Sequence, residues 1–567
     1  MGTPGLLPPG VSAPTIAPRA LADKLQAAFP LWAMGLEEPG LARHLASRAF
    51  LAGDADLRAC GLGLALWSWQ RAPLDRQRAD LLAELLPDAA PLKAWLRELL
   101  RRLDAPLPEE AQGADREGLR AEVGQLVAEG GAAQVVRALL PRLRDEATGL
   151  AWLALAWDSL LRLGSLELCR AALSACPWPE GPEGYGELRA RLEHEALFFL
   201  SPLPVPLETP KGEGTKYFTA WETLARAEMM LRTGEGQGAR LALAGLFAAM
   251  PWNVGLGLKL HALASPGPVA PARATGGASI LVYSWNKAAL ARQTLESLAR
   301  TDCGDARIFC LDNGSSDGTG EAMQDCAGLF APGALSVVRL PVNVGAPAAR
   351  NWLLSLPEVQ ARPWAVFLDD DVVLPERWLR RLLGQGEARP QCGAVGCRIV
   401  SASGPACLQS ADYQLFLPDG QPRTFRDLPE NVVLFDNCAG QLDLGLFTYA
   451  RPASHVSGCC HALRTEVLRE LGGFDIRFSP TQFDDLDRDL RSAVAGRPAA
   501  YAGDVAVAHV QHSSLAKAKG PAAMGQVFGN KIKLEGKFSQ ADMDGAARRG
   551  LEALWADMAA KWGELSG

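Results

Sequence analysis

From Leu21 to about Leu263, apolar residues recur at spacings of three and four positions. The runs LKAWLRELLRRL (92–103) and AAQVVRALLPRLRDEA (132–147) are examples of this pattern. Such spacing places apolar side chains on one face of a helix, where they can pack against neighbouring helices. The pattern therefore predicts an all-α domain of stacked amphipathic helices over residues 21–264.

Two segments of this helical region, residues 151–178 and 219–252, share one layout. Each has a first helix with Trp and Leu, an LRxG turn, an Ala- and Leu-rich second helix and a terminal Pro-Trp pair. The layout resembles tetratricopeptide-type helical hairpins, although the second copy carries extra residues before its Pro-Trp pair. An irregular helical domain without true repeats is the alternative interpretation.

The character of the chain changes at residues 265–277, SPGPVAPARATGG, which form a Pro-, Gly- and Ala-rich linker. Beyond it, β-rich runs alternate with helical stretches; the runs are ASILVYS, ARIFCLD, LSVVRL and WAVFLDD. This alternation predicts βαβ units in a parallel sheet that binds ligands at the carboxyl ends of its strands. We expect an α/β domain over residues 278–515 and a helical extension over residues 516–567. Residues 1–20 read as a disordered, Pro-rich leader without a signal-peptide pattern.

Three aspartates, Asp369, Asp370 and Asp371, directly follow the apolar run WAVFL. Adjacent carboxylates repel one another, and a divalent cation is the simplest compensation for that repulsion. Oxygen ligands suit Mg²⁺ or Mn²⁺, which complete their coordination with substrate phosphates and water. An acidic turn that caps the next helix is the alternative, but it accounts for one aspartate better than for three.

Polar residues also follow the second and third predicted strands. Asp312 and Asn313 precede a Gly- and Ser-rich turn, where a carboxylate can accept hydrogen bonds from a base or a ribose. Asn343, Gly345 and Arg350 surround the start of the helix after the third strand, and Arg350 is a candidate to face phosphates. An ordinary capped turn and a solvated surface arginine are the alternatives.

The net charge, the hydrophobic runs and the cysteines exclude some classes of protein. A net charge of −7 argues against nucleic acid as a partner, because nucleic-acid binders normally carry a basic face. No run of about 18 apolar residues is present, which predicts no transmembrane segment and leaves peripheral contact as the only membrane association. Twelve cysteines without a CxxC pair indicate reduced thiols and a cytoplasmic protein. Zinc at Cys459, Cys460 and His461 would need a fourth ligand and a different spacing.

Six segments occur in a characteristic order: YSWNK, LDNGSSDGT, NVGAPAARN, FLDDDVVLPERWL, SGCCHALRTEVLRELGGFD and FDDLDRDLRSAVAG. Together they resemble the successive motifs of inverting family 2 glycosyltransferases with the glycosyltransferase-A (GT-A) fold. The resemblance covers about Ala278 to Ser514, and it is specific because all six motifs have the expected order and spacing. It implies a Rossmann-like domain for a nucleotide diphosphate sugar, here preceded by the all-α domain.

The resemblance also implies roles for individual residues. In that family the aspartate after the second strand contacts the nucleobase, which here is Asp312. The Asp-x-Asp pair contacts the ribose and the metal, which here gives Asp369 and Asp371. The acidic pair after the Gly-Gly-Phe-Asp segment supplies the general base; Asp485 stands in the base position, and Asp484 stands where Glu is usual. The implied nucleotide-sugar residues are Ser284, Asn286, Asp312, Asn313, Asn343, Gly345, Arg350, Asp369 and Asp370.

Family members commonly place a histidine after the last strand, near the metal and the diphosphate, and the pattern points to His509. His512 competes for this role, and a core position is the alternative for both histidines. On the acceptor side we expect Gly458, Gly473 and Asp475. Residues 401–456 add aromatic candidates for sugar stacking, with core positions as the alternative: Tyr413, Phe416, Phe425, Phe435 and Tyr449.

These expectations combine into an inverting, metal-assisted transfer of a sugar from a UDP- or dTDP-type donor to a protein or glycan hydroxyl. The helical domain is a candidate to hold the acceptor, because repeat arrays present extended concave surfaces. A nucleotidyltransferase and a helical scaffold with an inactive transferase domain are the alternatives. The glycine-rich, basic opening loop of a nucleotidyltransferase is missing after the first strand, where the chain reads VYSWNKAAL. The full set of aspartates disfavours an inactive domain.

Overall fold

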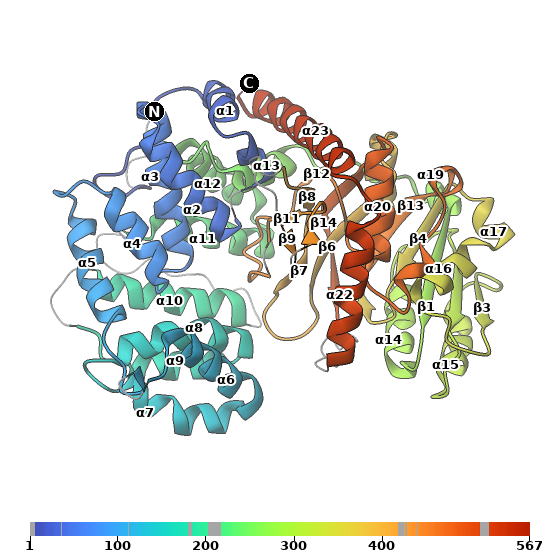
Figure 1. Cartoon of the computed structure of the whole chain (residues 1–567), viewed down its shortest axis with the longest axis horizontal. Coiled ribbons are helices and arrows are strands. Elements are labelled where there is room, and N and C mark those ends of the chain that lie inside the picture. The colour runs from blue at the N-terminus through green and yellow to red at the C-terminus, as the bar shows by residue number, and fades with distance from the viewer. Residues whose placement is uncertain are drawn as a thin grey trace. The chain divides into compact units, whose positions relative to one another are not determined.

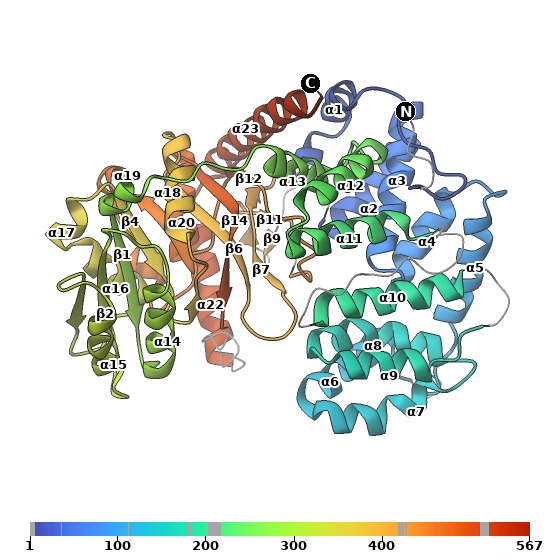
Figure 2. The same cartoon turned by 180° about the vertical axis from the view of Figure 1, so that it is seen from behind.

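The computed structural model describes residues 6–35, 37–110, 113–179, 184–201, 217–417, 424–425, 428–438, 440–510 and 521–566. The chain divides into two compact units, one of residues up to Leu260 and one of most residues from His261 onward. Figure 1 shows the first unit in blue to green, and Figure 2 shows the same elements from behind. The first unit is helical and the second is built around a sheet, which confirms the predicted combination of fold classes.

The helices of the first unit are short and follow the predicted apolar spacing. They are α1 (Pro18–Ala28), α2 (Pro39–Leu51), α3 (Ala55–Arg71), α4 (Arg76–Leu85), α5 (Pro91–Leu103), α6 (Arg116–Ala138), α7 (Leu140–Leu143), α8 (Gly149–Leu163), α9 (Leu166–Ala175), α10 (Tyr185–Leu200), α11 (Thr219–Thr233), α12 (Gly236–Ala249) and α13 (Val254–Ala264). In α5, for example, Trp95, Leu96 and Leu99 are buried, whereas Arg97 and Arg101 are exposed. The apolar stripe read from the sequence is therefore the face that packs.

The two segments with a shared layout correspond to the helix pairs α8–α9 and α11–α12. Each pair is joined through a glycine in the left-handed region, Gly164 at φ +81° and Gly234 at φ +86°. A glycine adopts this conformation without the steric penalty that a Cβ imposes, which explains the shared LRxG turn. A tetratricopeptide-type origin of the pairs stays a prediction.

The leader differs from the disorder that we expected for residues 1–20. Helix α1 already begins at Pro18, and Val11 is buried. The backbone N–H of Thr15 donates to Asp56 Oδ1 at 2.9 Å. The Thr15 hydroxyl donates to the same oxygen at 3.0 Å. Within the described part of this segment, the burial of Val11 and these two hydrogen bonds therefore tie the Pro-rich chain to the helices.

The second unit contains a ten-stranded mixed sheet within the described residues. Its main path runs β12-β14-β6-β13-β4-β1-β2-β3, with β5 paired to β14 and β7 paired to β6. The strands are β1 (Ala278–Ser284), β2 (Arg307–Asp312), β3 (Leu335–Arg339), β4 (Trp364–Leu368), β5 (Val372–Val373), β6 (Ala394–Ser401), β7 (Leu408–Ser410), β12 (Ala450–Ala453), β13 (Cys460–Arg464) and β14 (Ala499–His509). Strands β1 to β4 pair in parallel, as the βαβ pattern predicted, whereas β13 lies antiparallel to β4 and to β6.

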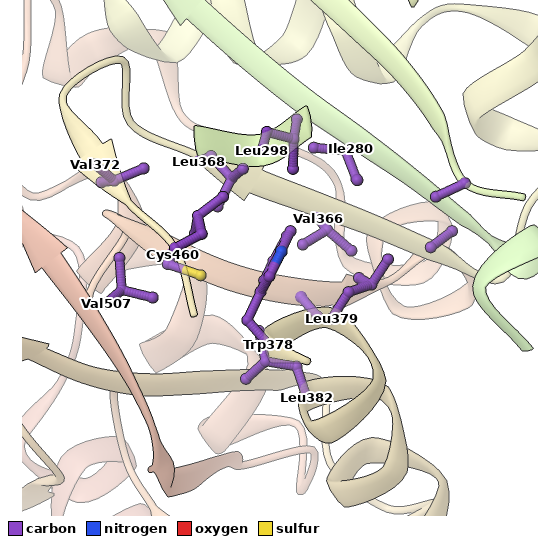
Figure 3. Close-up of a cluster of buried hydrophobic side chains, with 14 of the residues drawn as sticks. Ile280, Leu298, Val366, Leu368, Val372, Trp378, Leu379, Leu382, Cys460 and Val507 are labelled. Atoms are coloured by element: carbon purple, nitrogen blue, oxygen red, sulfur yellow. The ribbon is translucent and has the colours of Figure 1, made fainter. Parts of the chain in front are cut away.

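The apolar faces of the strands explain how helices cover the sheet. Helices α14 (Ala288–Ala299) and α18 (Trp378–Ala388) contribute Leu298, Trp378 and Leu382 to one buried cluster with Ile280 and Val366 of the strands, as Figure 3 shows. The opposite face carries α16 (Ala346–Leu354) and α20 (Asp484–Val494), which contact strands of the same sheet. Both faces are covered, so the polar groups of the sheet collect at the ends of the strands.

Shorter elements complete the second unit. They are η3 (Ala272–Gly277), α15 (Thr319–Asp325), η4 (Cys326–Leu329), α17 (Pro357–Gln360), α19 (Thr465–Leu471), η5 (Ile476–Phe478), and the two-stranded pairs β8 (Tyr413–Leu415) with β11 (Leu434–Asp436) and β9 (Thr424–Phe425) with β10 (Leu428–Pro429). Two C-terminal helices follow, α22 (Pro521–Glu535) and α23 (Gln540–Ser566), drawn in red in Figure 1. They share an apolar cluster with α20 that contains Leu490, Leu534 and Met543. Among the described residues, no helix has the length and apolar character needed to cross a membrane.

Candidate active site

The polar residues that follow the parallel strands meet at one edge of the sheet. Ser284 at the end of β1 is the register partner of Asp312 at the end of β2, and Asp369 follows the last residue of β4. A cleft with a volume of about 500 Å³ opens at this edge. It is lined by six of the predicted nucleotide-sugar residues: Ser284, Asn313, Asn343, Arg350, Asp369 and Asp370. Asp371, His509, Gly458, Asp484 and Asp485 line the same cleft.

Five predicted site residues do not line this cleft: Asn286, Asp312, Gly345, Gly473 and Asp475. Asp312 is buried, and its Oδ1 accepts a hydrogen bond from the N–H of Ser315 at 2.9 Å. The neighbouring Asn313 is the residue that reaches the cleft, where its Nδ2 donates to Asn343 Oδ1 at 2.9 Å. In this structure Asp312 therefore shapes the turn behind the cleft, and Asn313 faces into it.

Asn286 and Gly345 act on the backbone that surrounds the cleft. Asn286, at φ +52°, accepts at its Oδ1 a hydrogen bond of 2.8 Å from the N–H of Ser316. Gly345 has φ +84° just before α16, and its N–H donates to Asn343 Oδ1 at 2.8 Å. Both residues fix the shape of turns at the cleft rim.

The carboxylates after β4 are compensated by basic side chains. Lys287 Nζ lies 2.9 Å from Asp370 Oδ1 and 3.1 Å from Asp371 Oδ2. Asp370 also accepts a short hydrogen bond from Ser284 Oγ. Burial raises the pKa of Asp370 despite the opposing charge of Lys287. Burial would also raise the pKa of Asp371, but the hydrogen bond from His509 and the charge of Lys287 lower it below its ordinary value.

His509 is brought to these aspartates by strand pairing. His509 of β14 is the antiparallel register partner of Val372 in β5, directly after Asp371. Its Nε2 lies 2.9 Å from Asp371 Oδ1, and its Nδ1 lies 2.7 Å from Gln409 Oε1. Burial lowers the pKa of His509, but Asp371 and Asp369 reverse the effect and raise it above the ordinary value. The competing His512 lies outside the described residues.

Asp369 belongs to a group of side chains that can hold a cation. One ligand atom each from Asp369, Cys459 and His509 lies within 4.8 Å of the other two. Desolvation raises the pKa of Asp369 to about 6, although Arg350 and His509 lower it. Cys460 and His461 do not belong to this group, so among the described residues the alternative set of Cys459, Cys460 and His461 does not bring its ligand atoms together.

The acidic pair at the start of α20 is divided between two environments. Asp484 is buried, and its Oδ2 accepts a hydrogen bond of 2.6 Å from Arg350 Nη1. Arg350 is itself buried, lies 3.8 Å from Asp369 Oδ1, and stacks over the rings of Tyr283 and Phe474. Its guanidinium is therefore committed to the protein, which favours a role in holding Asp484 over the predicted direct contact with phosphates.

Asp485 faces the cleft and is held by backbone donors. Its Oδ2 accepts from the N–H of Gly458 at 2.9 Å, and its Oδ1 accepts from the N–H of Leu486 at 2.8 Å. Burial raises the pKa of Asp485, but the charges of His455 and Arg350 outweigh burial and lower it below the ordinary value. Asp485 is consequently ionised at neutral pH and fixed in orientation.

The predicted acceptor-side residues have separate positions. A Cβ added to Gly458 would lie 2.6 Å from Asp485 Oδ2, so the carboxylate can sit here only because residue 458 is glycine. Gly473 instead lines a smaller cavity of about 290 Å³, and Asp475 pairs with Lys537 at 2.8 Å. Of the three, only Gly458 touches the cleft.

The aromatic candidates do not line the cleft in the described structure. Phe435 and Tyr449 are buried, and the Tyr449 hydroxyl donates to Asp412 at 3.0 Å. Tyr413 and Phe416 are half-buried, and the side chain of Phe425 lies outside what the structure describes. The core alternative therefore holds for Phe435 and Tyr449.

The cleft residues that were not predicted from the sequence include two directly after the first strand, Trp285 and Lys287. Lys287 follows β1 by three positions, and Trp285 exposes 50% of its surface at the cleft. The signal for both was present in YSWNK, because a basic and an aromatic residue directly after a predicted strand end fall at the ligand-binding edge. An exposed tryptophan offers a flat apolar face on which a ring can stack.

Known proteins share features with this part of the chain. Residues 279–472 match the family model described as glycosyl transferase family 2. The O-antigen biosynthesis protein RfbC of Myxococcus xanthus is 30% identical over 151 residues, which are 26% of this chain. The matched segment spans 11% of the length of that curated relative.

Solved structures of glycosyltransferases are similar at low TM-scores. GalNAc-T7 with UDP, GalNAc and Mn²⁺ has a TM-score of 0.35 at 15% identity, covering 45% of this chain and 48% of that chain. TarS of S. aureus has a TM-score of 0.32 at 16% identity, covering 49% and 43%. Mannosyltransferase PcManGT of Pyrobaculum calidifontis, with GDP-Man and Mn²⁺, has a TM-score of 0.32 at 18% identity, covering 61% and 97%.

The second unit is a mixed α/β sheet with acidic residues at its strand ends, and its residues 279–472 match the glycosyl transferase family 2 model. Over these residues the chain is similar to family 2 glycosyltransferases. This match ends before Asp484 and Asp485, so it does not test the roles of these two aspartates.

Proposed function

We propose that the α/β unit transfers a sugar, with inversion, from a nucleotide diphosphate donor to an acceptor hydroxyl, assisted by a divalent cation. One observation carries this proposal. The carboxylates after β4, His509 and the ionised Asp485 line a single cleft at the carboxyl edge of the sheet. A nucleotide diphosphate and a nucleophilic hydroxyl can therefore meet there. UDP- or dTDP-sugars are the donors that we propose.

The donor side of the cleft fits a divalent cation. Carboxylate and imidazole donors suit Mn²⁺ or Mg²⁺, and Cys459 adds a softer donor at the same point. Gln409 accepts a hydrogen bond from Nδ1–H of His509, which leaves Nε2 as the nitrogen that ligates. We assign Asp369, Asp371 and His509 to this site. A cation held there would neutralise the negative charge that develops on the departing diphosphate.

The acceptor side requires a base, and Asp485 is the better candidate of the two acidic residues. Asp484 is engaged by Arg350, whereas Asp485 keeps an open approach from the cleft. In the proposed mechanism Asp485 accepts the proton of the acceptor hydroxyl as that oxygen attacks the anomeric carbon from the face opposite the diphosphate. Two backbone N–H groups hold the carboxylate in place, so it needs no reorganisation before the proton moves.

A panel of nucleotide sugars tests the proposal and separates it from its alternatives. The full chain is mixed with each nucleotide sugar and Mn²⁺, and nucleoside diphosphate release is measured with and without EDTA. We expect metal-dependent release from one donor and its loss in Asp485→Asn. Release of pyrophosphate from a nucleoside triphosphate and a sugar phosphate would instead indicate a nucleotidyltransferase. An absence of both products across the panel would contradict a catalytic role.

We further propose that the acceptor is a protein or a glycan hydroxyl and that the helical unit takes part in holding it. The name of the Myxococcus xanthus relative supports a glycan acceptor. Buried free thiols such as those of Cys60, Cys310 and Cys460 support our proposal of a reducing, cytoplasmic compartment. Transfer by the isolated α/β unit to the natural acceptor at the rate of the full chain would remove the role of the helical unit.

A further inference from the structure

The C-terminal helix α22 contacts the loop that directly precedes the acidic pair, Asp484 and Asp485. Asn530 of α22 is fully buried, and its Nδ2 group donates to three backbone carbonyls: Phe478 at 3.0 Å, Thr481 at 2.9 Å and Gln482 at 3.2 Å. These carbonyls belong to residues 478–483, which we call the 478–483 loop. A single buried amide therefore spans the loop directly before Asp484 and Asp485.

Neighbouring side chains fix which way this amide points. Its Oδ1 accepts hydrogen bonds from Gln526 Nε2 at 3.1 Å and from Lys533 Nζ at 3.0 Å. Because an ammonium group only donates, Oδ1 must face Lys533, and the NH₂ group must face the loop. Gln526 also donates to Ser479 O at 3.1 Å. Three residues of α22 thus form one hydrogen-bonded network with the loop backbone.

The 478–483 loop has a conformation that needs support. Gln482 has φ +81° and Phe483 has φ +71°, and neither residue is a glycine. L side chains rarely adopt this region, so surrounding contacts must hold two such residues in succession. The carbonyls of Thr481 and Gln482 that Asn530 binds lie at this point of the chain. Helix α20 begins with the next residue, Asp484.

The loop also forms part of the cleft wall. Pro480, Thr481 and Gln482 line the same cleft as Asp485. A second attachment lies just beyond α22, where Lys537 Nζ contacts Asp475 Oδ2 at 2.8 Å and Asp487 Oδ1 at 2.6 Å. The C-terminal helices therefore hold the chain on both sides of the acidic pair.

We propose that Asn530 is a positioning residue for sugar transfer: it holds the 478–483 loop so that Asp485 meets the acceptor hydroxyl. This inference rests on the proposed function of Asp485. It extends the catalytic unit into the C-terminal helices, which the family match over residues 279–472 does not reach. Asn530 touches neither donor nor acceptor and acts through the loop backbone.

The test compares two substitutions of Asn530 with a matched control in the full chain. Asn530→Asp keeps the size of the side chain but removes both N–H donors, and Asn530→Ala removes the group entirely. The control is Asn431→Ala, because Asn431 Nδ2 also donates to carbonyls, those of Glu535 at 3.3 Å and Phe538 at 2.9 Å, without touching the loop. Thermal unfolding is measured for all three so that stability losses can be matched.

Two readouts distinguish positioning from general stability. With the donor that the panel identifies, we expect both Asn530 variants to lose about 10- to 100-fold in kcat, because misplacing a reacting group by about 1 Å has effects of this size. We expect the donor KM to change by less than about 2-fold, since the cation and diphosphate side lies on other elements. Hydrogen–deuterium exchange across residues 476–488 should rise in both Asn530 variants and stay at the wild-type level in Asn431→Ala.

The outcomes separate this inference from the proposed function. A wild-type chain inactive on every donor overturns the proposed function, while the exchange measurement still tests whether Asn530 holds the loop. Wild-type kcat in Asn530→Asp overturns the positioning role. An equal loss of kcat in Asn431→Ala at matched stability overturns it as well, and so does unchanged exchange across residues 476–488.

Discussion

Asp484 and Asp485 are neighbours in the chain, but their side chains have different partners. Asp484 is bound by Arg350, whereas Asp485 is held by the N–H groups of Gly458 and Leu486 and faces the cleft. Asp484 stands at the position where glutamate is usual, and its side chain is shorter than that of glutamate by one methylene. Arg350 nevertheless reaches Asp484, because its Nη1 lies 2.6 Å from Asp484 Oδ2. Because the partners of Asp484 and Asp485 differ, we expect substitutions of these two residues to have different effects.

Asp485→Asn should lower kcat for transfer by about 10² to 10⁴-fold, the range expected for loss of a positioned base. Donor binding should remain, because the proposed cation ligands lie on other segments. Steady-state kinetics and isothermal titration with the donor measure the two effects separately. Near-normal turnover in this variant would contradict the role of Asp485.

The proposed cation site predicts that the affinity for Mn²⁺ depends on pH. The pKa of Asp369 is raised to about 6 by burial, and the pKa of His509 is raised above its ordinary value by Asp371 and Asp369 after burial has lowered it. Both groups gain protons as the pH falls, and each must lose its proton before it can ligate a cation. Mn²⁺ affinity should therefore fall as the pH is lowered through about 6.

Isothermal titration with Mn²⁺ in buffers of different ionisation enthalpy counts the protons released on binding. We expect release to be largest below neutral pH and to decrease in Asp369→Asn, which has no proton to lose. Proton release that is the same in Asp369→Asn and in the wild type would exclude Asp369 from the site.

At the scale of elements, the turn before β13 and the start of α20 fit together only through Gly458. A Cβ at this position would lie 2.6 Å from Asp485 Oδ2 and 3.0 Å from Asp485 Cβ. Gly458→Ala should displace the carboxylate and lower kcat by about 10-fold or more, since misplaced reacting groups lose rate steeply. Gly563→Ala is a suitable control, because a Cβ there meets nothing within 4 Å. Wild-type kcat in Gly458→Ala would show that the contact is relieved without moving the base.

Some of the strands and site residues could be predicted from local sequence patterns alone. Strands β1, β2 and β4 were predictable because each is a local run of buried β-branched and apolar residues next to a helical pattern. The cluster after β4 was predictable for the same reason, since Asp369 to Asp371 directly follow their strand. Lys287 is equally close to a strand end, but its contacts with Asp370 and Asp371 join segments more than 80 residues apart in the chain.

Contacts between distant segments were not predictable from these local patterns. Arg350 and Asp484 are 134 residues apart in the chain, so nothing local signalled that the arginine would bind the acidic pair instead of a phosphate. Asn530 lies 48 residues from Gln482 and carries no motif of its own. Asp312 was assigned from the family pattern, whereas the cleft is lined by Asn313. A shift of one residue at a strand end reverses which side chain faces the ligand, and sequence spacing does not resolve it.

At the scale of the whole molecule, the two compact units allow the roles of donor chemistry and acceptor selection to be tested apart. Every residue that lines the cleft belongs to the second unit, which begins near His261. A chain of residues 261–567 therefore contains the proposed base, the cation ligands and Asn530. It should release nucleoside diphosphate from the donor by hydrolysis at a rate within about 3-fold of the full chain, because water replaces the natural acceptor in this reaction and every cleft residue, Asp485 included, belongs to the second unit.

Transfer to the natural acceptor should behave differently. If the helical unit holds the acceptor, its removal raises the acceptor KM by at least about 10-fold, which corresponds to about 1.4 kcal/mol of lost binding. The donor KM should stay unchanged, and adding the separate helical unit in trans should fail to restore transfer, because the effective concentration given by the covalent link is lost. Equal acceptor KM values for the two chains would assign acceptor recognition to the α/β unit alone. Loss of donor hydrolysis together with transfer would show that the second unit depends on the first for its active conformation.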